Sequence, residues 1–139
     1  MKKVIQPLFA AILMGALFFA SCSKQDDPIN EPNNADPRAK FVGNWYVTEN
    51  STDYGSSTYN CTISDSTNAS YILIGCVYGF NKKAYATVSG NNFSIPAQII
   101  QGSSVSGGGT LANANQINMT YYVQVTISHY DTIVAVMTK

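Results

Sequence analysis

The chain has 139 residues, enough for one domain of ordinary size and too few for two. Only 12% of the residues are charged, whereas 45% are apolar and nine are tyrosines, and this balance favours strands over helices because strands prefer aromatic and β-branched residues. The formal net charge is +0 with no basic stripe along the chain, which argues against a nucleic-acid partner.

The first 21 residues predict a targeting segment that takes no part in the fold. Lys2 and Lys3 precede an apolar run from Leu8 to Ala20. That run has 13 residues, whereas a membrane-spanning helix needs about 20. We therefore expect a cleaved signal peptide over residues 1–21, the alternative being an uncleaved anchor helix.

A cysteine directly follows the apolar run, in the sequence FASC that ends at Cys22. This sequence resembles the lipobox of bacterial lipoproteins, which implies that Cys22 is lipidated and becomes the first residue of the mature chain. Two or three acyl chains give a stable anchor because each buried methylene contributes about 0.8 kcal/mol. The next residues, SKQDD, resemble the charge signature of surface lipoproteins of Bacteroidetes. The resemblance implies an outer-membrane protein, lipid-anchored and exposed at the cell surface.

Residues 22–39 then predict a disordered tether that carries the lipidated cysteine. The segment contains Pro28, Pro32 and Pro37 and shows no apolar periodicity, as is typical of chains that cannot bury a core. The folded domain is expected over residues 40–139.

Short runs of alternating apolar and polar residues fill this domain, separated by clusters of Gly, Asn, Ser and Asp, and they predict strands joined by tight turns. Eight strands are expected, over residues 41–49, 58–64, 71–77, 83–89, 93–100, 104–111, 116–128 and 132–138. The clearest run places Ile117, Met119, Tyr121, Val123, Val125 and Ile127 on one face. One dry and one wet face is typical of an antiparallel sheet, either closed into a barrel or packed in a sandwich.

The connections between the expected strands are those of hairpins. Residues 64–70, 89–92 and 112–115 are short and rich in Asn, Ser and Gly, as hairpin turns are. Pro96 predicts a bulge or a strand end, and the glycines at 107–109 predict a weakly packed strand that bulges easily. Consecutive hairpins predict a meander, and closure of a meander removes its edges. We therefore predict an all-β, eight-stranded antiparallel up-and-down β-barrel.

The first expected strand contains Gly43-x-Trp45, which resembles the signature of lipocalin and calycin barrels. The segments FVGNWYVTE, YATVSGNNFSIPAQ, SGGGTL and MTYYV make residues 40–139 resemble small lipocalin-like lipoproteins of Bacteroidetes. The resemblance implies a lipocalin- or streptavidin-like barrel in which Trp45 plugs the closed end. Lipocalins usually stack a late arginine on this tryptophan and pack a helix on the barrel. Here the late basic residue is Lys139 and no helix is predicted, so we expect the plug to be missing.

Two cysteines remain in the domain, and each lies on the apolar face of an expected strand. A hairpin that turns near residues 67–69 places Ile63 opposite Ile74 and Cys61 opposite Cys76. Facing Cβ atoms are about 4.5–5.5 Å apart, and an exported protein is free to form disulfides. We therefore expect a structural disulfide, with two buried free thiols as the alternative.

Acid–base groups are few in the domain, which holds Glu49, Asp53, Asp65, Asp131 and one histidine, His129. His129 and Asp131 are two residues apart and so can share a strand face, but no nucleophile elbow accompanies them and both fall at an expected hairpin tip. We interpret His129 as a solvated turn residue. One histidine is also too few for a metal site, so we expect no enzyme, no metal and no cofactor.

Aromatic residues are the remaining candidates for function. The residues expected to point inward as ligand contacts are Trp45, Tyr59, Tyr85, Phe93 and Tyr121. The tyrosines expected to be exposed are Tyr46, Tyr54, Tyr78 and Tyr122. Inward tyrosines form either ordinary core or a pocket with hydroxyl donors, and outward ones suit an interface.

The leading hypothesis is a surface lipoprotein whose barrel binds a small, largely apolar ligand inside or at the mouth. The chain is short, so its barrel is expected to leave little interior space. The alternative is a cell-surface protein-interaction or inhibitor module with a filled barrel and no small-molecule ligand.

Overall fold

The computed structural model of the protein describes residues 36–139. The expected signal peptide, Cys22 and the expected tether as far as residue 35 lie outside the described residues. Among residues 36–139, no helix has the length and apolar character that crossing a membrane requires.

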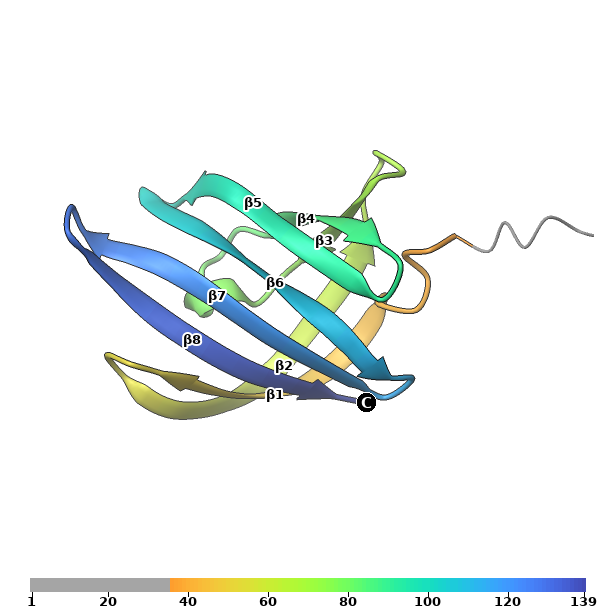
Figure 1. The fold of residues 1–139 in the computed structure, drawn as a ribbon, viewed down its shortest axis with the longest axis horizontal. Coiled ribbons are helices and arrows are strands. Elements are labelled where there is room, and N and C mark those ends of the chain that lie inside the picture. The colour runs from red at the N-terminus through yellow and green to blue at the C-terminus, as the bar shows by residue number, and fades with distance from the viewer. Residues whose placement is uncertain (1–35) are drawn as a thin grey trace, which may run out of the picture. The chain divides into compact units, whose positions relative to one another are not determined.

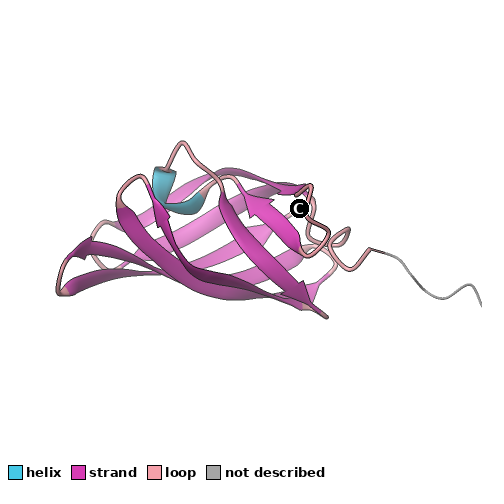
Figure 2. Cartoon of the chain, turned by 90° about the horizontal axis from the view of Figure 1, so that it is seen from above, coloured by secondary structure: helices cyan, strands magenta, loops and turns pink. Residues whose placement is uncertain are grey.

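Eight antiparallel strands form one closed barrel (Figures 1 and 2). The strands are β1 (Gly43–Ser51), β2 (Gly55–Asp65), β3 (Tyr71–Ile74), β4 (Ala84–Ser89), β5 (Asn92–Ile100), β6 (Ser103–Asn113), β7 (Gln116–Thr126) and β8 (His129–Thr138). Each strand pairs with the next in the chain, and β8 returns to pair with β1. The predicted eight-stranded antiparallel up-and-down barrel is therefore confirmed.

Strand β3 is shorter than the expected 71–77. It ends at Ile74, and the chain then forms a 3-10 turn, η1 (Val77–Gly79), in which Tyr78 adopts a φ of 55°. This turn is drawn in cyan in Figure 2. Because β3 is so short, β2 pairs with it at only three positions, Ile63–Asp65. The rest of β2 has no neighbouring strand on that side, and η1 lies there instead.

A disulfide ties η1 to β2 across this gap. Ile63 lies opposite Ile74, in the register that the sequence predicted. Two residues beyond this pair on each segment, Cys61 and Cys76 form a disulfide, with their Cα atoms 5.1 Å apart. The bond fixes the segment that carries Tyr78 against a stretch of β2 that the sheet alone would leave unpaired.

Alternate residues of every strand point inward and fill the barrel with large apolar side chains. Those with less than 2% exposure include Trp45, Val47, Ile63, Ile72, Ile74, Ile117, Tyr121, Ile133 and Met137. Burying one such side chain contributes roughly 1.5–3 kcal/mol. The interior is therefore a packed core over most of its length.

The glycines of β6 make close packing inside this core feasible. A Cβ on Gly109 would lie 2.5 Å from the ring of Phe93, and one on Gly107 would lie 2.4 Å from the carbonyl oxygen of Thr120. Rather than bulging at its glycines, β6 pairs with both neighbours through residues 107–109. The irregularity in the β5–β6 pairing falls between Ile95 and Gln98, at the predicted position of Pro96.

The predicted dry face of β7 is only partly correct. Ile117, Met119, Tyr121 and Val123 are buried, but Val125 is 41% exposed and Ile127 is 96% exposed. The pairing of β7 with β8 shifts register between Gln124 and Thr126, and this end of the hairpin has no core to cover.

The closed end of the barrel has the plug that we expected to be missing. The indole Nε1 of Trp45 donates to the carbonyl of Phe41 at 2.8 Å. The ammonium of Lys139 lies 4.2 Å from the centre of the Trp45 ring and donates to the carbonyl of Val42 at 3.0 Å. A Cβ on Gly43 would lie 3.2 Å from this ammonium. The expectation was wrong because a lysine one residue beyond β8 takes the place of the arginine, and Gly43 leaves room for it.

We predict that Lys139→Ala lowers the free energy of unfolding by about 1 kcal/mol, since it removes the cation from the face of Trp45. Lys139→Arg should keep most of the stability because a guanidinium also stacks on aromatic rings. Thermal unfolding measures the change, with Lys82→Ala, in the exposed loop before β4, as the control. Equal Tm values for Lys139→Ala and Lys82→Ala would contradict the role of the ammonium.

Candidate functional site

The two ends of the barrel differ in the chemistry of their inward residues. Trp45 and the segment before β1 close one end. The turns β1–β2, β5–β6 and β7–β8 surround the other, at the left in Figure 1. Along β1 the inward residues change from Trp45 and Val47 to Glu49 and Ser51. Along β8 the inward series runs from Ile133 to Asp131 toward the same end. We call this polar end of the barrel the mouth.

Glu49 is the centre of a hydrogen-bond network in the mouth. The hydroxyls of Tyr59 and Tyr121 donate to its Oε2 at 2.5 and 3.0 Å, and Ser57 donates to its Oε1 at 3.1 Å. The Tyr121 hydroxyl also accepts the backbone N–H of Tyr78 at 3.2 Å. The network therefore joins β1, β2, β7 and η1 around one carboxylate.

The phenols of this network keep their protons at neutral pH. Burial raises the pKa of Tyr59 and Tyr121, and the neighbouring Glu49 carboxylate raises both further. Each phenol is thus a fixed donor toward Glu49. Three neutral donors hold the carboxylate in one orientation, and none of them neutralises its charge.

Asp131 organises the β1–β2 turn at the rim. Its side chain is fully buried and accepts from Ser51 at 2.6 Å, from Thr52 at 2.8 Å and from the backbone N–H of Asp53 at 3.2 Å. Burial acts to raise its pKa, but the hydrogen bonds from Ser51, Thr52 and Asp53 hold the pKa below its usual range. Ser51 in turn accepts the backbone N–H of Tyr54 at 2.9 Å, so this carboxylate fixes the turn that presents Tyr54.

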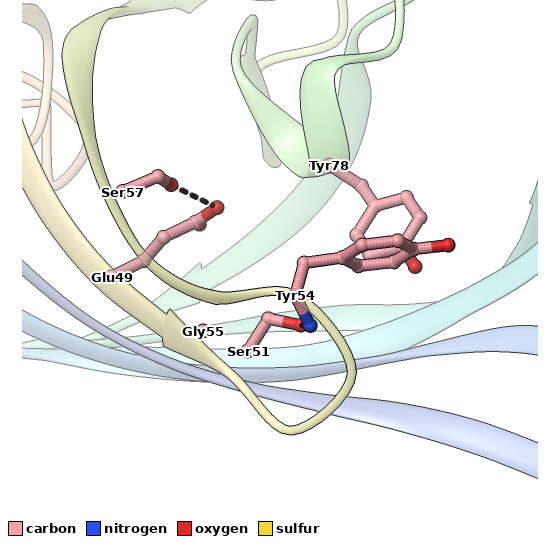
Figure 3. Close-up of a pocket in the computed structure, with 6 residues that line it drawn as sticks. All are labelled: Glu49, Ser51, Tyr54, Gly55, Ser57 and Tyr78. Atoms are coloured by element: carbon pink, nitrogen blue, oxygen red, sulfur yellow. Dashed lines mark hydrogen bonds between the residues drawn. The ribbon is translucent and has the colours of Figure 1, made fainter.

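A pocket of about 290 Å³ lies in the mouth (Figure 3). It is lined by Glu49, Ser51, Tyr54, Gly55, Ser57 and Tyr78. In Figure 3, Glu49 and Ser57 lie on one side and the rings of Tyr54 and Tyr78 on the other. The two ring centres are 6.0 Å apart at an interplanar angle of 68°. The pocket therefore combines a hydrogen-bonded carboxylate with two aromatic walls.

Tyr78 has a buried hydroxyl that makes no hydrogen bond within the described part of the chain. Burial raises its pKa, and the nearby Tyr54 and Asp131 side chains raise it further. The ring packs against Phe80 with the centres 5.4 Å apart. In Figure 3 the hydroxyl lies at the end of the ring away from Glu49, so Tyr78 presents its ring and not its hydroxyl to the pocket.

A second, lateral pocket of about 260 Å³ opens where β2 lacks a strand neighbour. It is lined by Tyr59, Asn60, Gly75, Cys76, Gly79 and Phe80. Tyr59 thus borders this pocket while its hydroxyl bonds to Glu49. The gap left by the short β3 therefore opens a pocket on the side of the barrel, separate from the lining of the mouth pocket.

The residues predicted to contact a ligand fall into three places. Trp45 and Phe93 lie in the core near the closed end, whereas Tyr59 and Tyr121 meet at Glu49. The predicted inward position of Tyr85 is wrong, because it is 36% exposed on the outer face and its ring lies 5.3 Å from that of Tyr71. The inward positions of β4 are the fully buried Ala84 and Ala86, since the crowded interior has room there only for small side chains.

The tyrosines predicted to be exposed behave as expected with one exception. Tyr46, Tyr54 and Tyr122 are 50%, 74% and 42% exposed, whereas Tyr78 is half-buried against the core. His129 is exposed and its Nε2 lies 2.8 Å from a carboxylate oxygen of Asp53. The pairing of His129 with Asp131 on one face, considered from the sequence, does not occur because Asp131 points into the barrel.

Glu49, Ser51, Ser57 and Asp131 were not predicted to be site residues. A signal for them was present: Glu49 and Ser51 continue the inward alternation of Trp45 and Val47, and polar residues in that phase mark the place where the core ends. Within residues 36–139, no three His, Cys, Asp or Glu side chains gather as a metal site would require.

Comparison with known proteins identifies the fold and no family. No family model and no curated protein matches the chain. Among solved structures, the chain is similar to a redesigned β-barrel, b11L5F_LGL, with 12% identity, a TM-score of 0.54 and coverage of 75% of this chain and 95% of that one. It is also similar to EF1p2_mFAP2b bound to DFHBI, with 12% identity, a TM-score of 0.54 and coverage of 75% and 97%. At this identity the likeness establishes the barrel architecture alone.

We predict that Asp131→Asn destabilises the protein by about 1–3 kcal/mol at pH 7, because buried donors lose a charged acceptor. The pKa of Asp131 is lower in the folded than in the unfolded chain, so its stabilising contribution is present above about pH 4 and is lost as the pH falls through the folded-state pKa. Urea unfolding at pH 7 and at pH 3 should therefore show a smaller difference between the variant and the unmodified protein at the lower pH. An unchanged difference would contradict this account.

Proposed function

We propose that the protein binds a small ligand at the mouth of the barrel, in the pocket between Glu49 and the rings of Tyr54 and Tyr78. The observation that carries the proposal is the lining of this pocket, where a carboxylate held by three hydroxyls faces two aromatic walls. Ligand sites typically combine apolar walls with a few fixed polar groups. The sequence left open whether a ligand would bind inside the barrel or at its mouth. The packed core favours the mouth.

The hydrogen bonds of the mouth support a binding role because they fix its groups before a ligand arrives. Tyr59, Tyr121 and Ser57 orient Glu49, while Asp131 and Ser51 orient the turn that carries Tyr54. A rigid site loses little conformational entropy on binding. The raised pKa values of Tyr59 and Tyr121 make both phenols weak acids that keep their protons, so each stays a hydrogen-bond donor to Glu49.

The barrel architecture is compatible with such a site. EF1p2_mFAP2b, which shares the fold at 12% identity, has a structure bound to DFHBI. A barrel of this kind can thus hold a small molecule, although that likeness says nothing of which ligand this chain would take.

We expect Tyr54→Ala to abolish ligand retention, because it removes one wall of the pocket without touching the core. The full chain, purified from its native host in a neutral detergent, is examined by native mass spectrometry for a stoichiometric small-molecule adduct. Tyr46→Ala, an exposed tyrosine on the outer face of β1, is the matched control and should keep the adduct. The absence of an adduct on the unmodified protein, or equal retention by both variants, would contradict the proposal.

A second candidate function is a protein-interaction module on the outer wall. Tyr46 of β1, Tyr122 of β7 and Tyr130, Val134 and Val136 of β8 are each 39–55% exposed on adjoining strands. Exposed apolar residues that adjoin one another suit a protein partner. This candidate gains if the unmodified protein carries no adduct and a partner binds to this wall.

We also propose that a lipid anchor holds the barrel at the cell surface, a proposal supported by the lipobox-like FASC and the acidic residues that follow Cys22. We predict that Cys22→Ala moves the protein from the membrane fraction to the soluble fraction of its host, since an acylated cysteine supplies the anchor. Fractionation followed by immunoblotting measures the shift, with Ser23→Ala as the control. Membrane retention of Cys22→Ala would refute the anchor.

A further inference from the structure

The mouth pocket holds a negative charge that no basic side chain of the described barrel balances. Every group that donates to Glu49 is a neutral hydroxyl, and the pocket lining contains no lysine or arginine. The rim adds Asp131, whose donors are also neutral, and Asp53, whose nearest cationic candidate is the exposed His129. Partly buried charges usually have a counter-charge, so a positive group is the complement that this pocket lacks.

The basic residues of the described domain are engaged away from the pocket. Arg38 pairs with Asp36, Lys40 bonds to Asn91 and Lys139 covers Trp45 at the closed end. Lys83 donates to Ser64 on the outer surface of the barrel. Lys82 is exposed in the loop before β4. A positive group would therefore have to come with the ligand.

Unused hydrogen-bond capacity points the same way. A carboxylate offers about four acceptor sites, and Glu49 uses three of them for protein donors. The remaining capacity is on Oε1, which has Ser57 as its one partner and lies on the pocket side in Figure 3. This oxygen suits a ligand that donates an N–H group.

The aromatic walls complete the complement. A cation over the face of a tyrosine ring gains roughly 0.5–2 kcal/mol, and the rings of Tyr54 and Tyr78 stand at 68° to each other on the side opposite Glu49. An anionic ligand would meet the Glu49 carboxylate with no positive side chain to offset the repulsion. The site therefore selects by charge as well as by shape.

We propose that the ligand of the mouth pocket is a small organic cation, an alkyl- or arylammonium that donates to Oε1 of Glu49 and lays its hydrocarbon part against Tyr54 and Tyr78. This inference rests on the proposed ligand-binding function and adds the chemical class of the ligand to it.

Three probes of similar size and different charge test this inference. Benzylammonium, benzyl alcohol and benzoate are titrated at pH 7 into the full chain in a neutral detergent, and calorimetry gives each affinity. We expect benzylammonium to bind at least about tenfold more tightly than benzyl alcohol, and benzoate to bind most weakly. Glu49→Gln should bring the ratio of the first two affinities close to one. Asp65→Asn, which removes an equal charge at the other end of β2, should leave the ratio unchanged.

The outcomes separate the two proposals. Equal binding of the ammonium and the alcohol, with both weakened by Tyr54→Ala, would overturn the cation inference and leave a ligand site in place. Binding of none of the three probes would count against the ligand site itself and the inference with it. The ranking of probes in the unmodified protein decides the matter even if Glu49→Gln does not fold, which its thermal melting curve would show.

Discussion

The pairing of β1 with β8 is the constraint on which the rest of the structure depends. It closes the sheet, so that every second residue of eight strands must share one narrow interior. An eight-stranded barrel has room for little more than its own side chains, and here Trp45, Tyr121 and a set of isoleucines occupy it. A site can then form only where the inward residues stop being apolar. That change occurs at Glu49 and Asp131, which is why the mouth holds the polar chemistry.

Closure also explains the asymmetry between the two ends. At one end Trp45 is sealed by the Phe41 carbonyl and by the ammonium of Lys139. At the other, the short β3 leaves part of β2 without a neighbour, and the disulfide between Cys61 and Cys76 holds η1 in its place. Because η1 carries Tyr78, the segment that fills the gap beside β2 also contributes an aromatic side chain to the mouth pocket.

The sequence predicted most of the fold because period-two alternation and hairpin turns are local signals. The strands, their order and the register that faces Ile63 with Ile74 follow from them. Tyr85 was misplaced because alternation in β4 does not say whether the tyrosine or its alanine neighbours point inward, and the structure buries Ala84 and Ala86. The position of Lys139 over Trp45 depends on closure of the barrel, which joins residues that are far apart in the sequence.

The site was harder to predict because polar residues near strand ends look like turn residues. In the sequence, Asp131 looks like a residue of a hairpin turn. Its inward orientation, in phase with Ile133, can be recognised only when β8 is known to begin before it. Glu49 reads as a solvated acid until Tyr59 and Tyr121 are brought to it from two other strands. The hydrogen-bond network therefore depends on closure of the barrel, which the sequence of its individual residues does not reveal.

The central claim is that the mouth, and neither the interior nor the outer wall, is the binding surface. Nuclear magnetic resonance of the isotope-labelled protein, titrated with benzylammonium, tests it directly by showing which backbone amides respond. The account predicts shifts at Glu49, Ser57 and Tyr78, with the amides around Trp45 and Val134 unaffected. Shifts centred on Val134 and Tyr122, or no saturable shift at the mouth, would contradict it.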